Sequence, residues 1–288
     1  MQIHSLFGSG KAVVSFEIFP PKPNYSLDTI FATLDGLKEL KPDFISVTYG
    51  AGGSSTERSI EIADKVKNEY HIETLAHLTC VGSTRGDIEK VLNRFSNHNI
   101  ENVLALRGDP PQGQAGFAAS NPGYKYAGDL VAHIKERTDF CVAAAAYPEG
   151  HLECPDLNVH FSHLKAKVDQ GVDFLITQLF FDNNIFFTFL DKARAQGIYC
   201  PVVVGIMPVL NAAQIKRMTS LCGASVPDGL QRILEKYANS AADMEKAGIE
   251  YACRQINNLL ENHADGIHLY TMNKAEQARI IMHQTGLR

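Results

Sequence analysis

The chain has 288 residues, of which 45% are hydrophobic and 20% are charged, and its formal net charge is −5. This composition excludes extensive disorder, because it provides enough apolar material for a sizeable core. Acidic and basic residues are interleaved without a basic stripe that could neutralise a phosphate backbone, so we expect no nucleic-acid partner. The N-terminus lacks an apolar signal-peptide core, and the longest apolar stretch, 201–210, is about half a membrane span. We therefore expect a cytoplasmic protein that is neither exported nor inserted into a membrane.

Short β-branched apolar runs alternate with longer segments of helical periodicity, a pattern typical of buried parallel strands joined by helices. The expected strands are 11–19, 43–50, 73–81, 102–109, 139–147, 173–181, 201–209 and 265–272. Eight such strands close a (β/α)8 barrel, the TIM-barrel fold. This fold uses a chain of this length in one domain, so we expect a single catalytic barrel domain over 1–288.

The expected outer helices include 27–40, 56–70, 87–95 and 128–137, where apolar residues recur at spacings of three and four. Between the seventh and eighth strands there is room for three helices, at 212–222, 229–237 and 242–263. These extra helices decorate the barrel without needing a second core. The stretch 110–123 is rich in Gly, Pro and Ala, so we expect a long flexible loop on the rim that usually serves the active site.

The cysteines show neither a C-x-x-C pair nor the histidine spacing of a zinc site. We expect reduced, mostly buried thiols and no bound metal. The six positions are Cys80, Cys141, Cys154, Cys200, Cys222 and Cys253.

Polar residues interrupt nearly every strand at its carboxyl end, where barrels of this kind build their chemistry. Burying a carboxylate costs several kcal/mol unless it is paired or protonated, so Glu17 and Asp109 are the most informative members. A barrel that needed only packing would not require this ring. Its members are Glu17, Thr48, Tyr49, His77, Thr79, Arg107, Asp109, Tyr147, Glu149, His151, Gln178 and Tyr270.

Each member also has a structural explanation. Glu17 could pair with a lysine or arginine, and Arg107 and Asp109, two residues apart, could neutralise each other. His77 could be a satisfied core histidine, and Gln178 could bridge backbone groups inside the barrel. These explanations must hold at every strand simultaneously, so the ring as a whole favours function.

Six motifs appear in order at the strand ends: VSFEIFPPK (14–22), VTYGAGG (47–53), AHLTC (76–80), LRGDPP (106–111), AAYPEGH (145–151) and ITQLFFD (176–182). Together they resemble methylenetetrahydrofolate reductases of the bacterial type, from about residue 13 to the C-terminus. The resemblance implies a barrel that holds FAD, is reduced by NADH or NADPH, and converts methylenetetrahydrofolate to methyltetrahydrofolate. It also implies a role in one-carbon metabolism and methionine biosynthesis, and a homo-oligomer.

The resemblance carries over to individual residues. Glu17 matches the catalytic acid, and Asp109 matches the carboxylate beside the flavin and pterin rings, where it serves catalysis, cofactor and substrate. Gln178 and Lys274 fall where the folate is contacted. The positions that hold the flavin, its phosphates or its adenosine are Thr48, Tyr49, His77, Arg107, Gly108, Asp109, Tyr126, Ala127, Tyr147, His151 and Lys167.

This sequence departs from the family pattern at four positions. His160, His163 and Ala166 stand where the family often has an acidic residue, an asparagine and an arginine, which bears on adenosine binding. Ala212 stands where a larger, often aromatic, side chain is expected to stack on the substrate. Eukaryotic relatives carry a C-terminal region that binds adenosylmethionine, and this chain is too short to contain one.

The mechanism implied by the resemblance is ping-pong, because the nicotinamide and the folate would use one open flavin face in turn. Glu17 would protonate the departing nitrogen as the folate ring opens to an iminium, and burial beneath the flavin would favour its neutral form. Ionised Asp109 would favour that cation. Two alternatives stay open: a flavin-free lyase or aldolase with a Schiff-base lysine, although no expected strand ends in lysine, and a non-catalytic folate-binding barrel.

Overall fold

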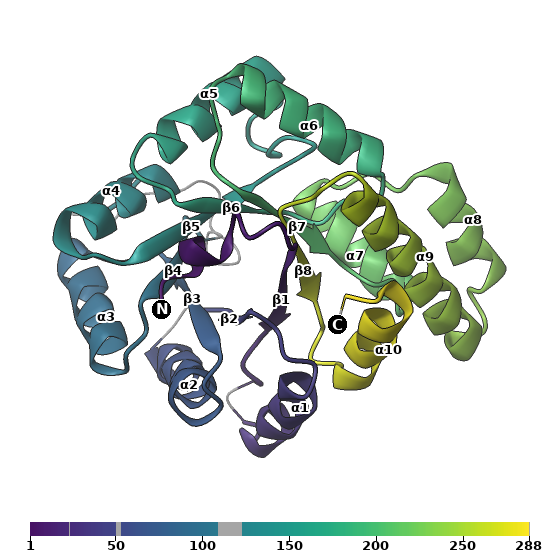
Figure 1. The fold of residues 1–288 in the computed structure, drawn as a ribbon, viewed down its shortest axis with the longest axis horizontal. Helices are drawn as coiled ribbons and strands as arrows, with labels where there is room; N and C mark the ends of the chain where they lie inside the picture. The colour runs from purple at the N-terminus through teal and green to yellow at the C-terminus, as the bar shows by residue number, and fades with distance from the viewer. Residues whose placement is uncertain (23, 50–52, 109–122, 288) are drawn as a thin grey trace.

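The computed structural model describes residues 1–22, 24–49, 53–108 and 123–287, with 53–55 as backbone only. Its strands pair in chain order as a closed parallel barrel, which confirms the predicted TIM-barrel fold (Figure 1). Each observed strand lies within its predicted range. The strands are β1 (Val13–Ile18), β2 (Phe44–Val47), β3 (Glu73–Thr79), β4 (Asn102–Leu106), β5 (Cys141–Ala146), β6 (Phe174–Thr177), β7 (Val202–Ile206) and β8 (Gly266–Tyr270).

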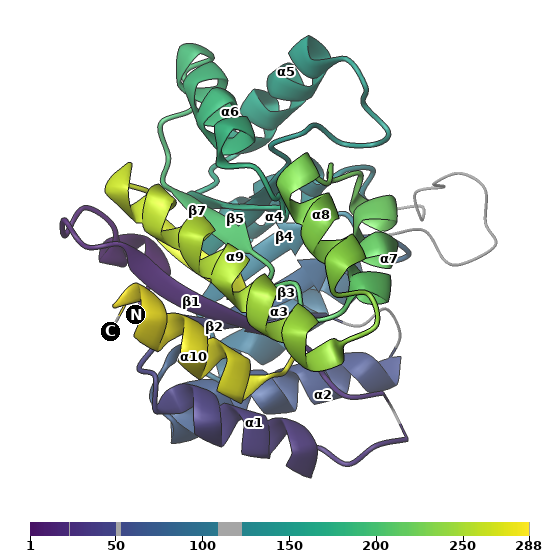
Figure 2. The same ribbon diagram turned by 90° about the vertical axis from the view of Figure 1, so that its right-hand side faces the viewer.

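Helices cover the outside of the barrel (Figures 1 and 2). The three helices predicted between β7 and β8 are all present, and α9 packs between α6 and α10, so α9 completes the outer ring while α7 and α8 are the additions. A π-helical turn, η2 (Lys65–Glu69), extends α2. The helices are α1 (Asp28–Lys38), α2 (Gly53–Asp64), α3 (Arg85–Asn97), α4 (Ala127–Arg137), α5 (Leu157–Val168), α6 (Asn183–Ala195), α7 (Ala212–Cys222), α8 (Asp228–Lys236), α9 (Ala241–Glu261) and α10 (Ala275–Thr285).

A glycine sets how closely α9 approaches the barrel. A Cβ atom on Gly248 would lie 1.7 Å from the carbonyl oxygen of Val209, in the segment after β7. Real Cβ atoms do not approach a backbone oxygen so closely, so only glycine lets the helix cross this segment. The close approach holds α9 in the ring position.

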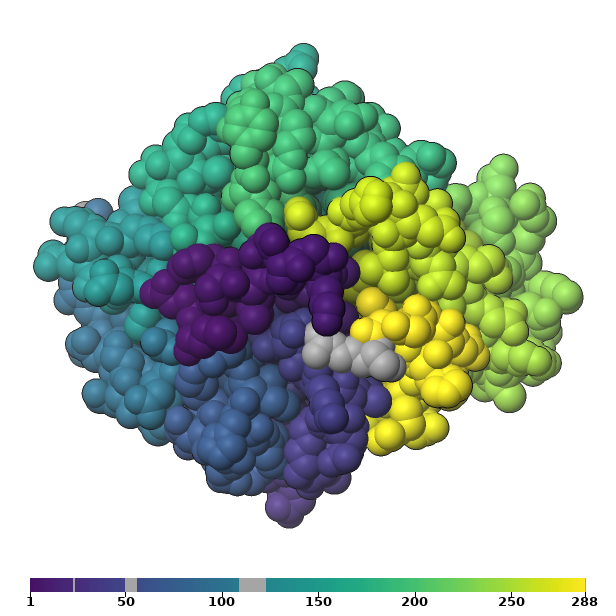
Figure 3. Space-filling view, in the orientation of Figure 1, coloured from purple at the N-terminus to yellow at the C-terminus, as the bar shows by residue number. Residues whose placement is uncertain are grey.

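The amino-terminal half of the barrel interior is apolar. Inward-facing side chains from seven strands form one buried cluster with Ile3, which belongs to the 3-10 helix η1 (Ile3–Leu6). The backbone N–H of Ile3 donates to Asn102 Oδ1 at 2.7 Å, and the ring of Phe7 packs on Phe174 with centroids 5.3 Å apart. In the space-filling view the N-terminal segment covers the centre of this face (Figure 3). This end of the barrel is therefore closed, and the predicted ring of polar residues lies at the other end.

The cysteines are free thiols, as predicted. Cys80, Cys141 and Cys253 are buried and the others are partly buried. Within the described ranges, no helix combines the length and the apolarity that crossing a membrane requires. The predicted flexible loop at 110–123 lies outside the described residues apart from Gly123, which bridges Thr84.

Candidate active site

Glu17 lies at the carboxyl end of β1 and faces two histidines. Its Oε2 atom is 3.6 Å from Nε2 of His77 on β3 and 3.7 Å from Nε2 of His268 on β8. Its side chain is 21% exposed, so the carboxyl group remains accessible at the barrel mouth. Among the described residues its ion-pair partners are histidines, not the lysine or arginine of the structural explanation.

His77 is buried, and its Nε2 atom has no hydrogen-bond partner among the described residues. Burial lowers its pKa to about 4, and nearby His268 adds to this effect while the charge of Glu17 opposes it. The ring is therefore neutral at pH 7. Because the buried nitrogen has no hydrogen bond, the picture of a satisfied core histidine does not fit, and a polar group of a ligand could use this atom.

His268 faces Glu17 from the other side, and sequence reasoning missed it. It is fully buried, with Nδ1 2.8 Å from Ser15 Oγ and Nε2 3.4 Å from Ser46 Oγ. A signal was available, because His268 stands two residues before Tyr270 on the same strand, and residues two apart point to the same face. The serines on β1 and β2 orient the ring that faces Glu17.

Tyr270 lies beside these residues in a space that a glycine leaves free. Its hydroxyl donates to the Thr177 carbonyl at 2.7 Å. A Cβ atom on Gly205 would lie 2.4 Å from that carbonyl oxygen and 2.7 Å from the Tyr270 hydroxyl. Burial raises the pKa of Tyr270 well above its ordinary value, and the charge of Glu17 adds to this, so the phenol stays neutral.

A cavity of about 730 Å³ opens between the ends of β4 and β5 and helices α4 and α5. Side chains from all four elements and their loops reach it. Six of the predicted cofactor-binding residues line it together: Arg107, Tyr126, Ala127, Tyr147, His151 and Lys167.

Arg107 enters the cavity from the end of β4 and forms a two-point ion pair with Glu153. Its Nη2 atom donates to Glu153 Oε1 at 2.9 Å, and Nη1 donates to Oε2. The Arg107 side chain is 17% exposed and that of Glu153 is 57% exposed. The hydrogen bonds from Arg107 lower the pKa of Glu153, although its partial burial opposes this. Sequence reasoning missed Glu153, which stands in the loop after β5.

Lys167 of α5 reaches the cavity from the opposite side. Its ammonium group donates to the Ala145 carbonyl at 2.6 Å, and burial lowers its pKa to about 8. His160, His163 and Ala166, which depart from the family pattern, line the same cavity. His160 is buried and its Nε2 atom has no hydrogen-bond partner in the described part of the chain. The departures are therefore concentrated around one ligand-sized space.

Other predicted residues lie at strand ends but do not line this cavity. Thr48 and Tyr49 follow β2, and Gly108 after β4 has φ +85°, where a Cβ atom would lie 2.6 Å from Val81 Cγ1. The Gln178 amide oxygen accepts from the N–H of the adjacent Leu179 at 2.9 Å. Lys274 is exposed at the start of α10. Asp109 lies outside the described residues.

A family model for methylenetetrahydrofolate reductase matches residues 2–286. The chain belongs to this family. It is 34% identical to the 5,10-methylenetetrahydrofolate reductase of Salmonella typhimurium over 279 residues, which cover 97% of this chain and 92% of that protein. The same figures hold for the Escherichia coli protein of that name.

A plant relative is longer than this chain. The protein called methylenetetrahydrofolate reductase (NADH) 1 from Arabidopsis thaliana is 36% identical over 297 residues, covering 99% of this chain and 50% of that protein. The chain therefore spans about half the length of this plant relative. A solved Clostridium thermocellum structure, described as binding two copies of 5-methyl-5,6,7,8-tetrahydrofolic acid, has a TM-score of 0.65 at 14% identity. It covers 96% of this chain and 95% of its own, and it shows the fold alone.

Proposed function

We propose that this chain reduces methylenetetrahydrofolate to methyltetrahydrofolate with electrons from NADH or NADPH, using bound FAD. The observation that carries the proposal is the accessible carboxyl group of Glu17 at the barrel mouth of a chain of this family. The position beside two buried histidines suits a proton donor, because neither neighbour is a permanent cation that would keep the carboxyl group ionised. The names of the relatives support the choice of substrate.

The residues around the cavity fit a flavin dinucleotide. A volume of about 730 Å³ is in the range of cofactor pockets. Arg107 and Lys167 can supply charge-assisted donors to a pyrophosphate, and Tyr126 and Tyr147 offer aromatic faces. The unpartnered ring nitrogens of His77 and His160 offer polar contacts to such a ligand. The same donor set has no obvious use in a barrel that only packs.

Bound FAD would supply hydride-transfer chemistry between the nicotinamide and the folate, and use of one site by both substrates in turn predicts ping-pong kinetics. The chain itself would bind and orient the substrates and exclude water from the barrel mouth. Glu17, which lies beside His77 and His268, would give a proton to the departing nitrogen of the folate. Asp109, Gln178 and Lys274 remain the proposed folate contacts.

The finer points of the proposal rest on the family. The name of the plant relative favours NADH over NADPH. A cytoplasmic location, a homo-oligomer and a role in methionine biosynthesis stay predictions.

Absorption spectroscopy tests the proposal directly. The purified protein is expected to show visible flavin absorption that NADH bleaches without oxygen and that methylenetetrahydrofolate then restores. A colourless protein that cleaves a small metabolite would favour the lyase alternative. Folate binding without turnover would favour the non-catalytic barrel. Either result would overturn the proposal.

A further inference from the structure

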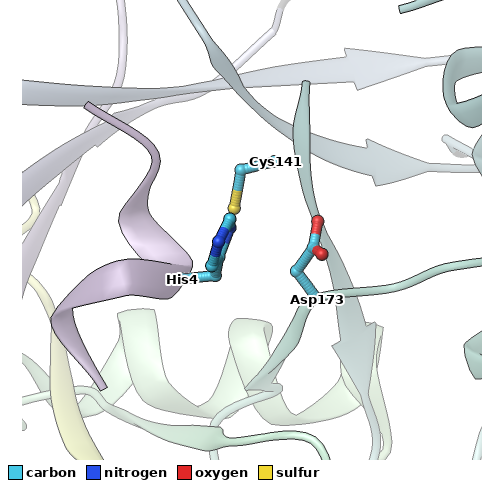
Figure 4. A group of neighbouring side chains, drawn as sticks. All are labelled: His4, Cys141 and Asp173. Carbon is cyan, nitrogen blue, oxygen red and sulfur yellow. The ribbon is translucent and has the colours of Figure 1, made fainter. Parts of the chain in front are cut away.

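Three metal-ligating side chains meet at the end of the barrel opposite Glu17. His4 comes from η1, Cys141 is the first residue of β5, and Asp173 directly precedes β6. A ring nitrogen of His4, the Cys141 sulfur and a carboxylate oxygen of Asp173 all lie within 4.8 Å of one another (Figure 4). They come from segments far apart in the chain, so no sequence spacing predicts the group.

The Asp173 carboxylate is already oriented by its neighbours. Its Oδ2 atom accepts from Lys135 Nζ at 2.6 Å and from the Val142 N–H at 2.7 Å. Within the described residues, Oδ1 accepts no hydrogen bond, so it is available as a ligand. Fixed outer partners of this kind hold a ligating carboxylate in place around a metal.

The Cys141 sulfur is buried and surrounded by backbone donors. Burial and the charge of Asp173 raise the pKa of its thiol to about 12, while hydrogen bonds from the backbones of His4 and Ile3 and the charge of Lys135 act in the opposite direction. The free thiol is therefore protonated at pH 7. A metal ion would displace that proton, and the backbone donors would stabilise the thiolate.

We propose that His4, Cys141 and Asp173 bind one zinc ion, or another divalent transition-metal ion of similar preference, with water as a fourth ligand. Zinc accepts nitrogen, sulfur and oxygen ligands together, whereas magnesium and calcium prefer oxygen. Tetrahedral zinc at about 2.0–2.3 Å from each ligand requires ligand separations of roughly 3.3–3.7 Å. The three ligand atoms lie within 4.8 Å of one another, so side-chain shifts of about 1 Å would bring them to this spacing.

A metal ion at this site would link η1, through His4, to strands β5 and β6 and so stabilise the docked N-terminal segment. Ile3 is fully buried and Phe7 packs on Phe174, so η1 is docked and His4 is already positioned. Little ordering is then required when the metal binds. Because the site lies at the far end of the barrel from Glu17, its effect is on stability and not on hydride transfer.

Calorimetric titration of the whole protein with zinc tests the proposal. Two buffers of different ionisation enthalpy allow the number of released protons to be counted. We expect one ion per chain, release of about one proton at pH 7, and a higher Tm with zinc. Cobalt should give the charge-transfer absorption of a thiolate ligand, and magnesium should have no effect. Absence of saturable zinc binding to the unaltered protein would overturn the proposal.

Two variants and a control locate the site. His4→Ala changes an exposed residue, so it should fold normally, keep its turnover, and bind zinc at least about tenfold more weakly. Cys141→Ser should lose the cobalt–thiolate band. Cys154→Ser is the matched control, because Cys154 is the other cysteine beside a histidine, with Sγ 3.9 Å from His163 Nδ1. Unchanged affinity in His4→Ala, a persistent band in Cys141→Ser, or loss of binding in Cys154→Ser would each contradict the assignment.

Discussion

The carboxylate of Glu17 lies 3.6 Å from Nε2 of His77, a buried ring that is neutral because burial lowers its pKa to about 4. An arginine or lysine at this place would favour the ionised carboxylate, whereas a neutral imidazole does so far less. The absence of a permanent cation in this pair agrees with the proposed role of Glu17 as the proton donor.

Glu17→Gln is expected to lose folate reduction by about 10²–10⁴-fold, the usual contribution of a general acid. Nicotinamide oxidation with an artificial acceptor should remain within about twofold, because that half-reaction needs no proton from Glu17. Stopped-flow absorption measures the two half-reactions separately. Glu39→Gln, which changes an exposed carboxyl group beyond the end of α1, is the control and should preserve both. Equal losses in both half-reactions of Glu17→Gln would make Glu17 structural.

The strands and the rim acid could be predicted because they depend on local pattern. A run such as 11–19 is β-branched and apolar, and burying a carboxylate near its end is costly unless the group is paired or protonated, which draws attention to Glu17. His268 was missed because its importance depends on side-chain contacts with Glu17 and Ser15 on the neighbouring strand β1, which strand periodicity does not show.

Long-range pairings could not be predicted for the same reason. The spacing of two residues left open a pair between Arg107 and Asp109, which lies outside the described residues. The described structure pairs Arg107 with Glu153, 46 residues away, because the loop after β5 returns over the end of β4. His4 and Cys141 likewise meet only because η1 crosses the end of the barrel. Such contacts depend on loop paths, which hydrophobic periodicity does not encode.

The buried histidine predicts how stability depends on pH. The pKa of His77 is about 4 in the folded protein and about 6.5 in an unfolded chain, so the unfolded state binds more protons between these values. The free energy of unfolding should therefore fall as pH decreases from 6.5 to 4, with a contribution from this residue on the order of 3 kcal/mol. Above pH 6.5 this contribution is fully present.

Denaturant unfolding of the protein and of His77→Gln, at several pH values in this window, checks the prediction. The variant should show a shallower decrease, because glutamine does not titrate. The slopes above pH 7 should agree. Parallel curves over the whole range would show that His77 is protonated in the folded state or does not contribute.

The ion pair between Arg107 and Glu153 predicts opposite effects for its two members. Glu153 is 57% exposed, so the pair contributes only about 0–1 kcal/mol, and its carboxylate competes with an anionic cofactor for Arg107. Glu153→Gln should therefore strengthen FAD binding by up to about fivefold. Arg107→Gln should weaken it by about tenfold or more, since hydrogen bonds to charged groups contribute about 1.5–3 kcal/mol.

Fluorescence titration of the flavin-free protein measures both affinities. The gain in Glu153→Gln should shrink at high salt, because exposed charges are screened. If Glu153→Gln weakened FAD binding instead, the carboxylate would be holding Arg107 in position for the cofactor and not competing with it.

The crossing of α9 over the chain after β7 makes one glycine essential to the fold. A Cβ atom on Gly248 would lie 1.7 Å from the Val209 carbonyl oxygen, and backbone cannot move aside as a flexible side chain can. Gly248→Ala should therefore destabilise the protein by about 1–3 kcal/mol or more, despite the better helix propensity of alanine.

Gly229→Ala in α8 is the matched control, because a Cβ atom there meets nothing within 4 Å among the described residues. That variant should be neutral or up to about 1 kcal/mol more stable. Thermal and denaturant unfolding compare the two, and equal stability of both variants would mean that α9 does not depend on the close approach at Gly248.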